Sequence, residues 1–238
     1  PGITHCYQRD GWPSLWFTMT APAGRFRDEV RKAAALVAPR AFLDLPVRRA
    51  FKIGVILDAR HGRQSEGAAG HSCPKPGETV SAREFSDREK LLIRLLCGNV
   101  GVSADPFADL AKKAGFGHDE LLGVLEEWKS AGILRRVGLV PYHRELGFVV
   151  NGMCVWKVDP ADIEKAGKTA ARAPEVTHCY ERVMDPRFPF NFFAMVHADA
   201  MDRAEAVRGR IAGDAGLSGG RMFVSVREFK KSSPVYFG

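Results

Sequence analysis

One heptapeptide occurs twice in this chain, and this duplication constrains the possible folds more than any other feature. Ile3-Thr4-His5-Cys6-Tyr7-Gln8-Arg9 recurs as Val176-Thr177-His178-Cys179-Tyr180-Glu181-Arg182. Two further blocks follow in the same order in both places: Trp12-Pro13 with Phe188-Pro189, and Arg49-Ala50-Phe51-Lys52 with Arg227-Glu228-Phe229-Lys230. The spacing between equivalent residues grows only from 173 at the first block to 178 at the last, as small loop insertions would cause. The chain is therefore expected to hold two copies of one structural unit.

The second copy is preceded by sequence that the first copy lacks. Residues from about Phe85 to Thr169 have no counterpart before Pro1, so the first copy corresponds only to the later part of the unit. A stretch rich in glycine, proline and serine separates the copies and is typical of a flexible linker. We expect four parts: an incomplete first copy at 1–57, the linker at 58–84, a helical domain at 85–145 and the second copy at 146–238.

Three short helices are predicted in the helical domain. Ser86 and Glu89 have the spacing of a capping box, and leucines follow at helical intervals. Pro106 opens a second helix, and His118–Ala131 is expected to form a third. Helices of this length, followed by a wing at Ile133–Val137, indicate a winged helix-turn-helix domain.

Strands alternate with helices in the second copy. The order βαββαβ predicts a ferredoxin-like domain, so the fold class is α+β. The first copy supplies only ββαβ, which leaves a sheet edge unpaired, and we expect an upstream segment or a partner to cover that edge. The expected elements are Ile3–Arg9, Leu15–Thr20, Phe26–Val37 and Leu43–Arg49 in the first copy, and Phe148–Val158, Pro160–Arg172, Val176–Arg182, Asn191–His197, Asp199–Ala212 and Met222–Arg227 in the second.

Composition excludes several classes of protein. No run of about 18 apolar residues is present that could cross a membrane. The five cysteines are odd in number and form no C-x-x-C pair, which argues against a disulfide framework or a zinc site and favours the cytoplasm. The net charge of +7 fits either nucleic acid or a small ligand with many carboxylates.

Three motifs carry a resemblance to a known family. They are Tyr142-His143-Arg144-Glu145-Leu146-Gly147-Phe148, Asn151-Gly152-Met153-Cys154-Val155-Trp156, and the doubled Thr-His-Cys-Tyr-x-Arg. A helix-turn-helix followed by βαββαβ resembles the Lrp/AsnC regulators, and these motifs look like the siroheme decarboxylase branch. The tandem copies are similar to the fused subunit pair of haem d1 producers. The absent front half of the first copy departs from that pattern, so His143 and Arg144 have no counterpart there.

The resemblance implies a carboxy-lyase. Its substrate would be siroheme, which loses the carboxyl groups of the C12 and C18 acetate side chains to give 12,18-didecarboxysiroheme. This activity belongs to haem d1 or alternative haem biosynthesis. No separate cofactor is expected, because the macrocycle of the substrate can delocalise the charge that decarboxylation leaves. The expected partners are related decarboxylase subunits in a homo- or hetero-oligomer, together with the upstream half of the first copy, and neither nucleic acid nor a membrane.

The repeated motif suits such a substrate. Strand alternation places Val176, His178, Tyr180 and Arg182 on one face, and His5, Tyr7 and Arg9 repeat that face in the first copy. We interpret His178 and Tyr180 as catalytic groups. Arg182 and the first-copy residues His5, Tyr7 and Arg9 are expected to bind the substrate, because arginine grips carboxylates bidentately. The alternative is an ordinary polar sheet surface.

A second cluster is expected where the helical domain meets the second copy. Arg135, Arg136 and Arg144 would form a carboxylate-binding wall, and His143 would be a proton donor. No metal site formed by the protein alone is predicted. His143 or His178 could, however, bind the iron of siroheme. Trp156 is a candidate for stacking on the macrocycle, although core packing is favoured for this residue taken alone. A solvated wing is the alternative for the arginines.

Two other functions compete with this interpretation. A DNA-binding regulator should carry a basic third helix, but the segment from His118 to Gly132 holds four acidic residues against Lys129. We therefore expect a helical domain that no longer binds DNA. A non-catalytic tetrapyrrole-binding protein would bind siroheme without releasing CO₂.

Overall fold

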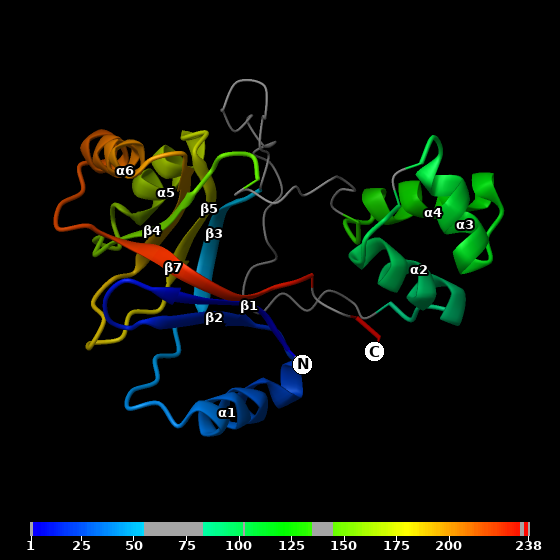
Figure 1. The fold of residues 1–238 in the computed structure, drawn as a ribbon, viewed down its shortest axis with the longest axis horizontal. Coiled ribbons are helices and arrows are strands. Elements are labelled where there is room, and N and C mark those ends of the chain that lie inside the picture. The colour runs from blue at the N-terminus through cyan, green and yellow to red at the C-terminus, as the bar shows by residue number, and fades with distance from the viewer. Residues whose placement is uncertain (1, 55–82, 102, 135–144, 234–235, 238) are drawn as a thin grey trace.

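A computed structural model describes residues 2–54, 83–101, 103–134, 145–233 and 236–237. Figure 1 shows a group of three helices, α2 to α4, to one side of a sheet that carries the remaining elements. The elements are β1 (Ile3–Arg9), β2 (Leu15–Met19), η1 (Ala23–Arg25), α1 (Phe26–Val37), β3 (Val47–Ile53), α2 (Asp87–Cys97), α3 (Pro106–Ala114), α4 (His118–Ser130), β4 (Val150–Trp156), α5 (Ile163–Arg172), β5 (Val176–Arg182), β6 (Phe192–Ala198), α6 (Met201–Ala215) and β7 (Arg221–Lys231).

The three helices of the helical domain begin where local capping predicts. Ser86 and Glu89 form the expected capping box at the start of α2, and Asp105 caps α3 ahead of Pro106. The helices enclose one apolar cluster in which Leu92, Leu121 and Trp128 are almost fully buried. The predicted helix-turn-helix arrangement is thereby confirmed, while most of the wing at Ile133–Val137 lies outside the described residues.

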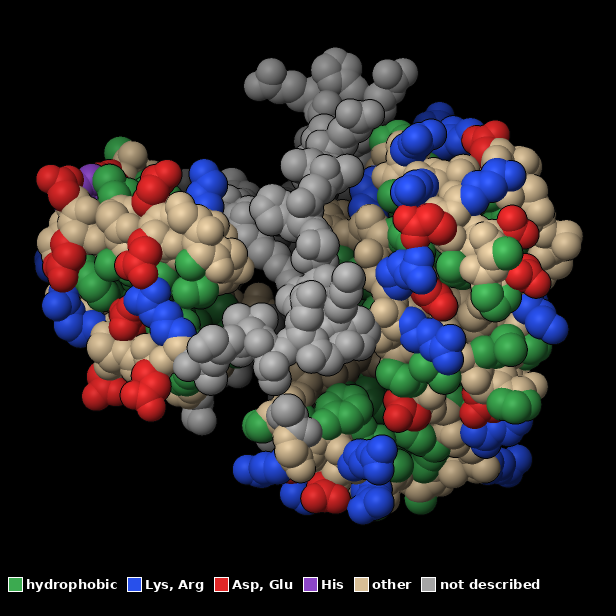
Figure 2. All heavy atoms as spheres, turned by 180° about the vertical axis from the view of Figure 1, so that it is seen from behind, with side chains coloured by type: hydrophobic (Ala, Val, Ile, Leu, Met, Phe, Trp, Pro, Cys, Tyr) green, Lys and Arg blue, Asp and Glu red, His purple; other side chains and the backbone are tan. Residues whose placement is uncertain are grey.

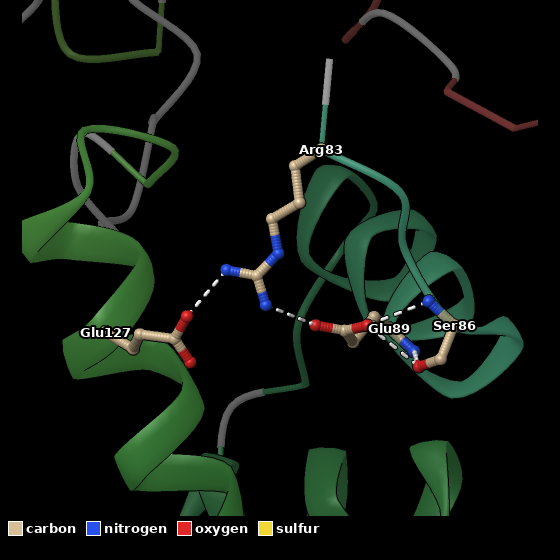
Figure 3. A network of polar contacts seen from close by, with 4 residues as sticks. All are labelled: Arg83, Ser86, Glu89 and Glu127. Atoms are coloured by element: carbon tan, nitrogen blue, oxygen red, sulfur yellow. Dashed lines mark hydrogen bonds and ion pairs between the residues drawn. The ribbon is translucent and has the colours of Figure 1, made fainter. Parts of the chain in front are cut away.

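A polar network ties the start of α2 to α4 (Figure 3). One guanidinium nitrogen of Arg83 donates to Glu127 at 2.6 Å, and the other donates to Glu89 at 2.9 Å. Glu89 also accepts from the backbone N–H of Ser86 in the capping box. An acidic side chain of α4 is therefore used to hold the helices of its own domain together.

The second copy forms the predicted ferredoxin-like sheet. Its strands lie in the order β7-β4-β6-β5, and α5 and α6 cover one face (Figure 1). Every second residue of the strands packs under these helices, as in β6, where Phe192, Ala194 and Val196 are fully buried. The apolar alternation of the sequence therefore builds this core directly.

The first copy does not form a sheet of its own. β1 and β2 extend the sheet beyond β7, while β3 pairs with β5 at the opposite end, giving the order β2-β1-β7-β4-β6-β5-β3 (Figure 1). The unpaired edge that we expected is therefore not at β1, which has a neighbour on each side. The outer strands of the described sheet are β2 and β3.

The two contacts between the copies are equivalent residue by residue. Tyr7 lies opposite Glu228 at the β1–β7 contact, and their repeat equivalents Tyr180 and Ala50 lie opposite each other at the β3–β5 contact. The remaining pairs follow the same rule. At the β1–β7 contact they are His5–Lys231, Cys6–Lys230, Gln8–Arg227 and Arg9–Ser225. In the same order, the equivalent pairs at the β3–β5 contact are His178–Ile53, Cys179–Lys52, Glu181–Arg49 and Arg182–Val47. The copies are thus related by a pseudo-two-fold axis and exchange strands reciprocally.

The last strand of the first copy was predicted four residues too early. It runs over Val47–Ile53 rather than Leu43–Arg49, and its equivalent β7 likewise continues past Arg227 to Lys231. Both extensions pair with the other copy, which the sequence of a single unit does not indicate. The early part of β7 pairs with β4, and no described strand offers such a partner to Leu43–Pro46, which is not a strand in the described structure. A strand equivalent to β4, pairing with both β2 and β3, remains our prediction for what covers these edges.

The repeat supplies a matched pair of phenylalanines for testing this packing. Phe51 of β3 contacts Phe192 and lies over Gly167 of α5, where a Cβ atom would collide with its ring. Its equivalent Phe229 is 50% exposed. We predict that Phe51→Ala lowers the free energy of unfolding by about 2 kcal/mol or more, since truncation of a well-buried Phe costs about 3–5 kcal/mol. Phe229→Ala should change it by less than about 1 kcal/mol. Urea unfolding of both variants checks this, and equal losses would contradict the packing described.

Candidate functional site

The face of the sheet opposite α5 and α6 carries the candidate site. Its centre is an aromatic cluster in which Phe188, Phe193 and Phe223 are almost fully buried. Trp16 of the first copy packs against all three rings, with centroid distances between 5.5 and 6.3 Å. This cluster joins the two copies and supports the repeated motif on either side of it.

The motif of the second copy forms a continuous row on this face. The rings of His178 and Tyr180 stack at 6.1 Å, and the guanidinium of Arg182 lies 5.3 Å from the Tyr180 ring. The predicted common face of these three residues is confirmed. Val176 is not part of it, because a β-bulge between Val176 and His178 turns Val176 into the core under the helices.

The first copy repeats the row. His5 and Tyr7 lie 6.2 Å apart, and the Arg9 guanidinium is 5.8 Å from the Tyr7 ring. Tyr7 lies opposite Trp16, and its equivalent Tyr180 lies opposite Phe193. The strand register therefore makes Trp16 and Phe193 equivalent positions. If the spacing between Pro13 and Pro189 continued unchanged, Trp16 would instead match Phe192, one residue away. Accordingly Trp16 lies on the same face as the row, whereas Phe192 lies under the helices.

Both arginines of the motif bind the backbone of the opposite copy. Arg9 donates to the carbonyl of Phe223 at 2.6 Å, and Arg182 donates to that of Leu45, the equivalent residue, at 2.7 Å. Burial lowers the pKa of Arg9 to about 10 and also lowers the pKa of Arg182. Arg9 is only 3% exposed, so its placement argues against the predicted role as a carboxylate clamp and favours a role between the copies. Arg182 is half-buried, and its role in binding a carboxylate remains a prediction.

A buried chain of hydrogen bonds crosses the sheet from Arg9 to the row of the second copy. Arg9 and Ser225 each donate to the Oδ1 atom of Asn151, at 3.3 and 3.2 Å. The amide nitrogen of Asn151 lies 3.3 Å from Nε2 of His197, whose Nδ1 is 3.4 Å from the hydroxyl of Thr177. That hydroxyl in turn lies 3.0 Å from Nδ1 of His178.

Sequence reasoning did not select the middle of this chain. Asn151 entered only as part of a family motif, and His197 and Thr177 were given no role. A signal for His197 was nevertheless present, because it continues the alternation of Phe193 and Met195 on this face with a polar residue. The missing information was the pairing of strands β4, β5 and β6.

Trp156 was wrongly assigned to the substrate. It is fully buried in the core between the sheet and its helices, on the face opposite Arg182, with Gly220 against its indole ring. A side chain in that position cannot stack on a ligand bound by the row. Core packing, the alternative reading, is the correct one for Trp156.

The second predicted cluster cannot be located in the structure. Arg135, Arg136, His143 and Arg144 all lie outside the described residues. Within the described ranges, no group of three or more His, Cys, Asp or Glu side chains could hold a metal ion. Nor is any described helix both long and apolar enough to span a bilayer.

The environment of His5 yields a prediction about its protonation. Burial of the ring and then the nearby Lys231 ammonium lower the pKa of His5 below 6.5, while Glu228 partly raises it. Because the folded-state pKa is depressed, the stabilisation from neutral His5 is present above pH 6.5 and is lost as the pH falls below it. NMR titration should place the midpoint of His5 below 6.5, raise it in Lys231→Gln and lower it further in Glu228→Gln. A midpoint at or above 6.5 would contradict this geometry.

Comparison with known proteins identifies both described domains. Residues 89–135 match the model of the siroheme decarboxylase NirDL-like HTH domain, and residues 145–230 match that of the AsnC-like ligand binding domain. The structure resembles a transcriptional regulator from Neisseria meningitidis with a TM-score of 0.54. That likeness covers 65% of this chain and 98% of the regulator at 13% identity, and it shows the fold alone.

More similar proteins cover most or all of the chain. The siroheme decarboxylase of Hydrogenobacter thermophilus is 33% identical over 244 residues, which cover 100% of this chain and 70% of that protein. The NirDL subunit of the Paracoccus denitrificans enzyme is 33% identical and covers 83% of this chain and 59% of its own length. The crystal structure of the siroheme decarboxylase NirDL matches with a TM-score of 0.66 and 29% identity, over 100% of this chain and 67% of that one. These matches show that the chain belongs to the siroheme decarboxylase family.

Proposed function

We propose that this protein removes CO₂ from the C12 and C18 acetate side chains of siroheme and yields 12,18-didecarboxysiroheme. The observation that carries the proposal is the His178–Tyr180–Arg182 row, held on the sheet of a chain that resembles siroheme decarboxylases over its whole length. A related structure, that of NirDL, was solved in complex with an iron-uroporphyrin III analogue. That complex supports a tetrapyrrole as the ligand.

The charge of the protein suits the substrate. Siroheme carries eight carboxylates, and the chain has a formal net charge of +7. Arg182 presents a planar guanidinium beside the Tyr180 and Phe193 rings, which is a suitable place for a carboxylate next to an aromatic macrocycle. Arg135, Arg136 and Arg144 remain predicted to contribute further cations.

The chemistry requires a place for an electron pair and a source of a proton. When the bond between the acetate methylene and its carboxyl carbon breaks, CO₂ leaves and the electron pair stays on the methylene carbon. The conjugated macrocycle delocalises this pair until a proton reaches the same carbon and makes a methyl group. His178, Tyr180 or His143 would deliver the proton. On this account the substrate's own macrocycle supplies the electron sink, and no separate cofactor is needed.

Related subunits are the proposed protein partners. Several similar proteins are named as subunits of siroheme decarboxylases, among them a beta subunit of Methanosarcina barkeri, 38% identical over 59% of this chain. The outer strands β2 and β3 are the edges at which added chain would continue the sheet. We propose that a related subunit, or the upstream half of the first copy, occupies this place.

The repeat supplies the matched control for the catalytic test. We predict that His178→Ala lowers the rate of CO₂ release about a hundredfold, because loss of a proton donor costs on that order. His143→Ala should also lower turnover, whereas Arg144→Ala and Arg182→Ala should mainly weaken substrate binding. His5→Ala, the equivalent substitution in the first copy, should have a smaller effect than His178→Ala.

Mass analysis of the extracted tetrapyrrole is the measurement. Loss of two CO₂ units per siroheme supports the enzyme, and bound but unchanged siroheme would instead identify a tetrapyrrole carrier. Wild-type turnover in both the His143 and His178 variants would refute the roles assigned to these histidines.

A DNA-binding regulator is the second candidate, because the fold is shared with such regulators. The third helix argues against it. In α4, Glu120 pairs with Arg88 at 3.0 Å and Glu127 pairs with Arg83, so two of its acids are tied to the rest of the domain. Asp119 and Glu126 are exposed, and Figure 2 shows acidic side chains distributed over the helical domain.

An acidic helix facing DNA would repel phosphates, so we predict no tight DNA binding. In a mobility-shift assay at low salt, any binding should be weak and independent of sequence. A specific complex at nanomolar protein concentration would restore the regulator as the leading candidate.

A further inference from the structure

The hydrogen-bond chain across the sheet is built in only one of the two copies. His178 contacts the Thr177 hydroxyl at 3.0 Å, and the equivalent His5 contacts the Thr4 hydroxyl at 3.1 Å. The next member of the hydrogen-bond chain after the threonine, His197, has a different residue as its counterpart in the first copy. The backbone N–H of His197 donates to the carbonyl of Glu175, as that of Thr20 does to Gly2, so Thr20 is the counterpart of His197. The first copy therefore has no imidazole at this point.

The contacts of Asn151 determine which nitrogen of His197 carries the proton. A guanidinium can only donate hydrogen bonds, so the Asn151 oxygen must face Arg9, and the amide NH₂ must face His197. Nε2 of His197 then accepts. The proton of the neutral ring lies on Nδ1, where it points to the Thr177 hydroxyl.

The same constraint continues to His178. The Thr177 oxygen accepts from Nδ1–H of His197, which leaves its own hydrogen to donate to Nδ1 of His178. The carbonyl of Met195, at 3.5 Å, is a more distant acceptor for that hydrogen. An Nδ1 atom that accepts a hydrogen bond leaves the ring proton on Nε2.

We infer that His197 is a positioning residue that, through Thr177, holds His178 in the tautomer with its proton on Nε2. The geometry makes the second copy the one whose histidine is prepared for proton transfer, and the first copy a partner that supplies Arg9. Asn151, His197 and Ser225 are buried, and Thr177 is fully buried, so water does not compete for these hydrogen bonds. This inference rests on the proposed function for its catalytic meaning, but the tautomer itself does not.

The decisive variants keep the shape of the site and remove one hydrogen bond each. His197→Phe removes both ring nitrogens, while His197→Gln retains an acceptor for Asn151 and a donor for Thr177. Thr177→Val removes only the hydroxyl and serves if His197→Phe does not fold. The matched controls in the first copy are Thr4→Val and Thr20→Val, at the equivalent positions.

Nitrogen NMR of the imidazoles in the substrate-free protein is the first readout. In the wild type, Nδ1 of His178 and Nε2 of His197 should give the shifts of unprotonated ring nitrogens. In His197→Phe and Thr177→Val, His178 should become a mixture of tautomers, while the spectrum of His5 stays unchanged. A protonated Nε2 on His197, or a His178 spectrum that neither variant alters, would overturn the inference.

Steady-state siroheme turnover in the intact protein is the second readout. His197→Phe and Thr177→Val should each lower kcat about tenfold or more with little change in KM, because the wrong tautomer cannot deliver its proton. His197→Gln should restore most of kcat, and both control variants should retain it. Equal losses in His197→Gln and His197→Phe would mean a merely structural role. If the wild type does not decarboxylate siroheme, the proposed function fails, and the NMR result still decides the tautomer.

Discussion

Reciprocal pairing between the two copies is the constraint on which the rest of the structure depends. β1 pairs with β7, the last strand of the second copy, and its equivalent β5 pairs with β3, the last strand of the first copy, in the same register. Each motif row therefore begins on a strand whose backbone is held by the opposite copy. The arginine that ends the row donates to a carbonyl of that copy, at 2.6 and 2.7 Å. Neither copy could present its row correctly without the other.

One face of the sheet holds the main apolar core, and the other face carries the candidate site. On one face, α5 and α6 bury an apolar core in which Trp156 and Phe192 are fully covered. The other face combines aromatic rings with polar groups linked by hydrogen bonds, from Arg9 through Asn151 and His197 to Thr177. Leaving a buried polar group without a partner is costly, so these hydrogen bonds fix the orientations of Asn151, His197 and Thr177. The pairing of the strands thereby determines the orientation of the His178 imidazole.

Local features were predictable from the sequence, and contacts between distant strands were not. The start of α2 follows from the Ser86 capping box and that of α3 from Pro106, because capping involves only neighbouring residues. Strand alternation likewise placed His178 and Tyr180 on one face. The predicted face of Val176 was wrong because of a β-bulge, and the predicted bounds of β3 were four residues too early. Both features depend on pairing with another strand. For the same reason His197 was not found, because its link to His178 through Thr177 depends on the pairing of β6 with β5.

Joining two related units in one chain permits them to become different. In a dimer of identical chains, a substitution in one unit is necessarily present in both, so two equivalent positions cannot hold different residues. Here one position holds His197 in the second copy and Thr20 in the first, although the backbone hydrogen bonds there are the same. Fusion thus allows a symmetric scaffold to specialise one half for chemistry and to keep the other as its support.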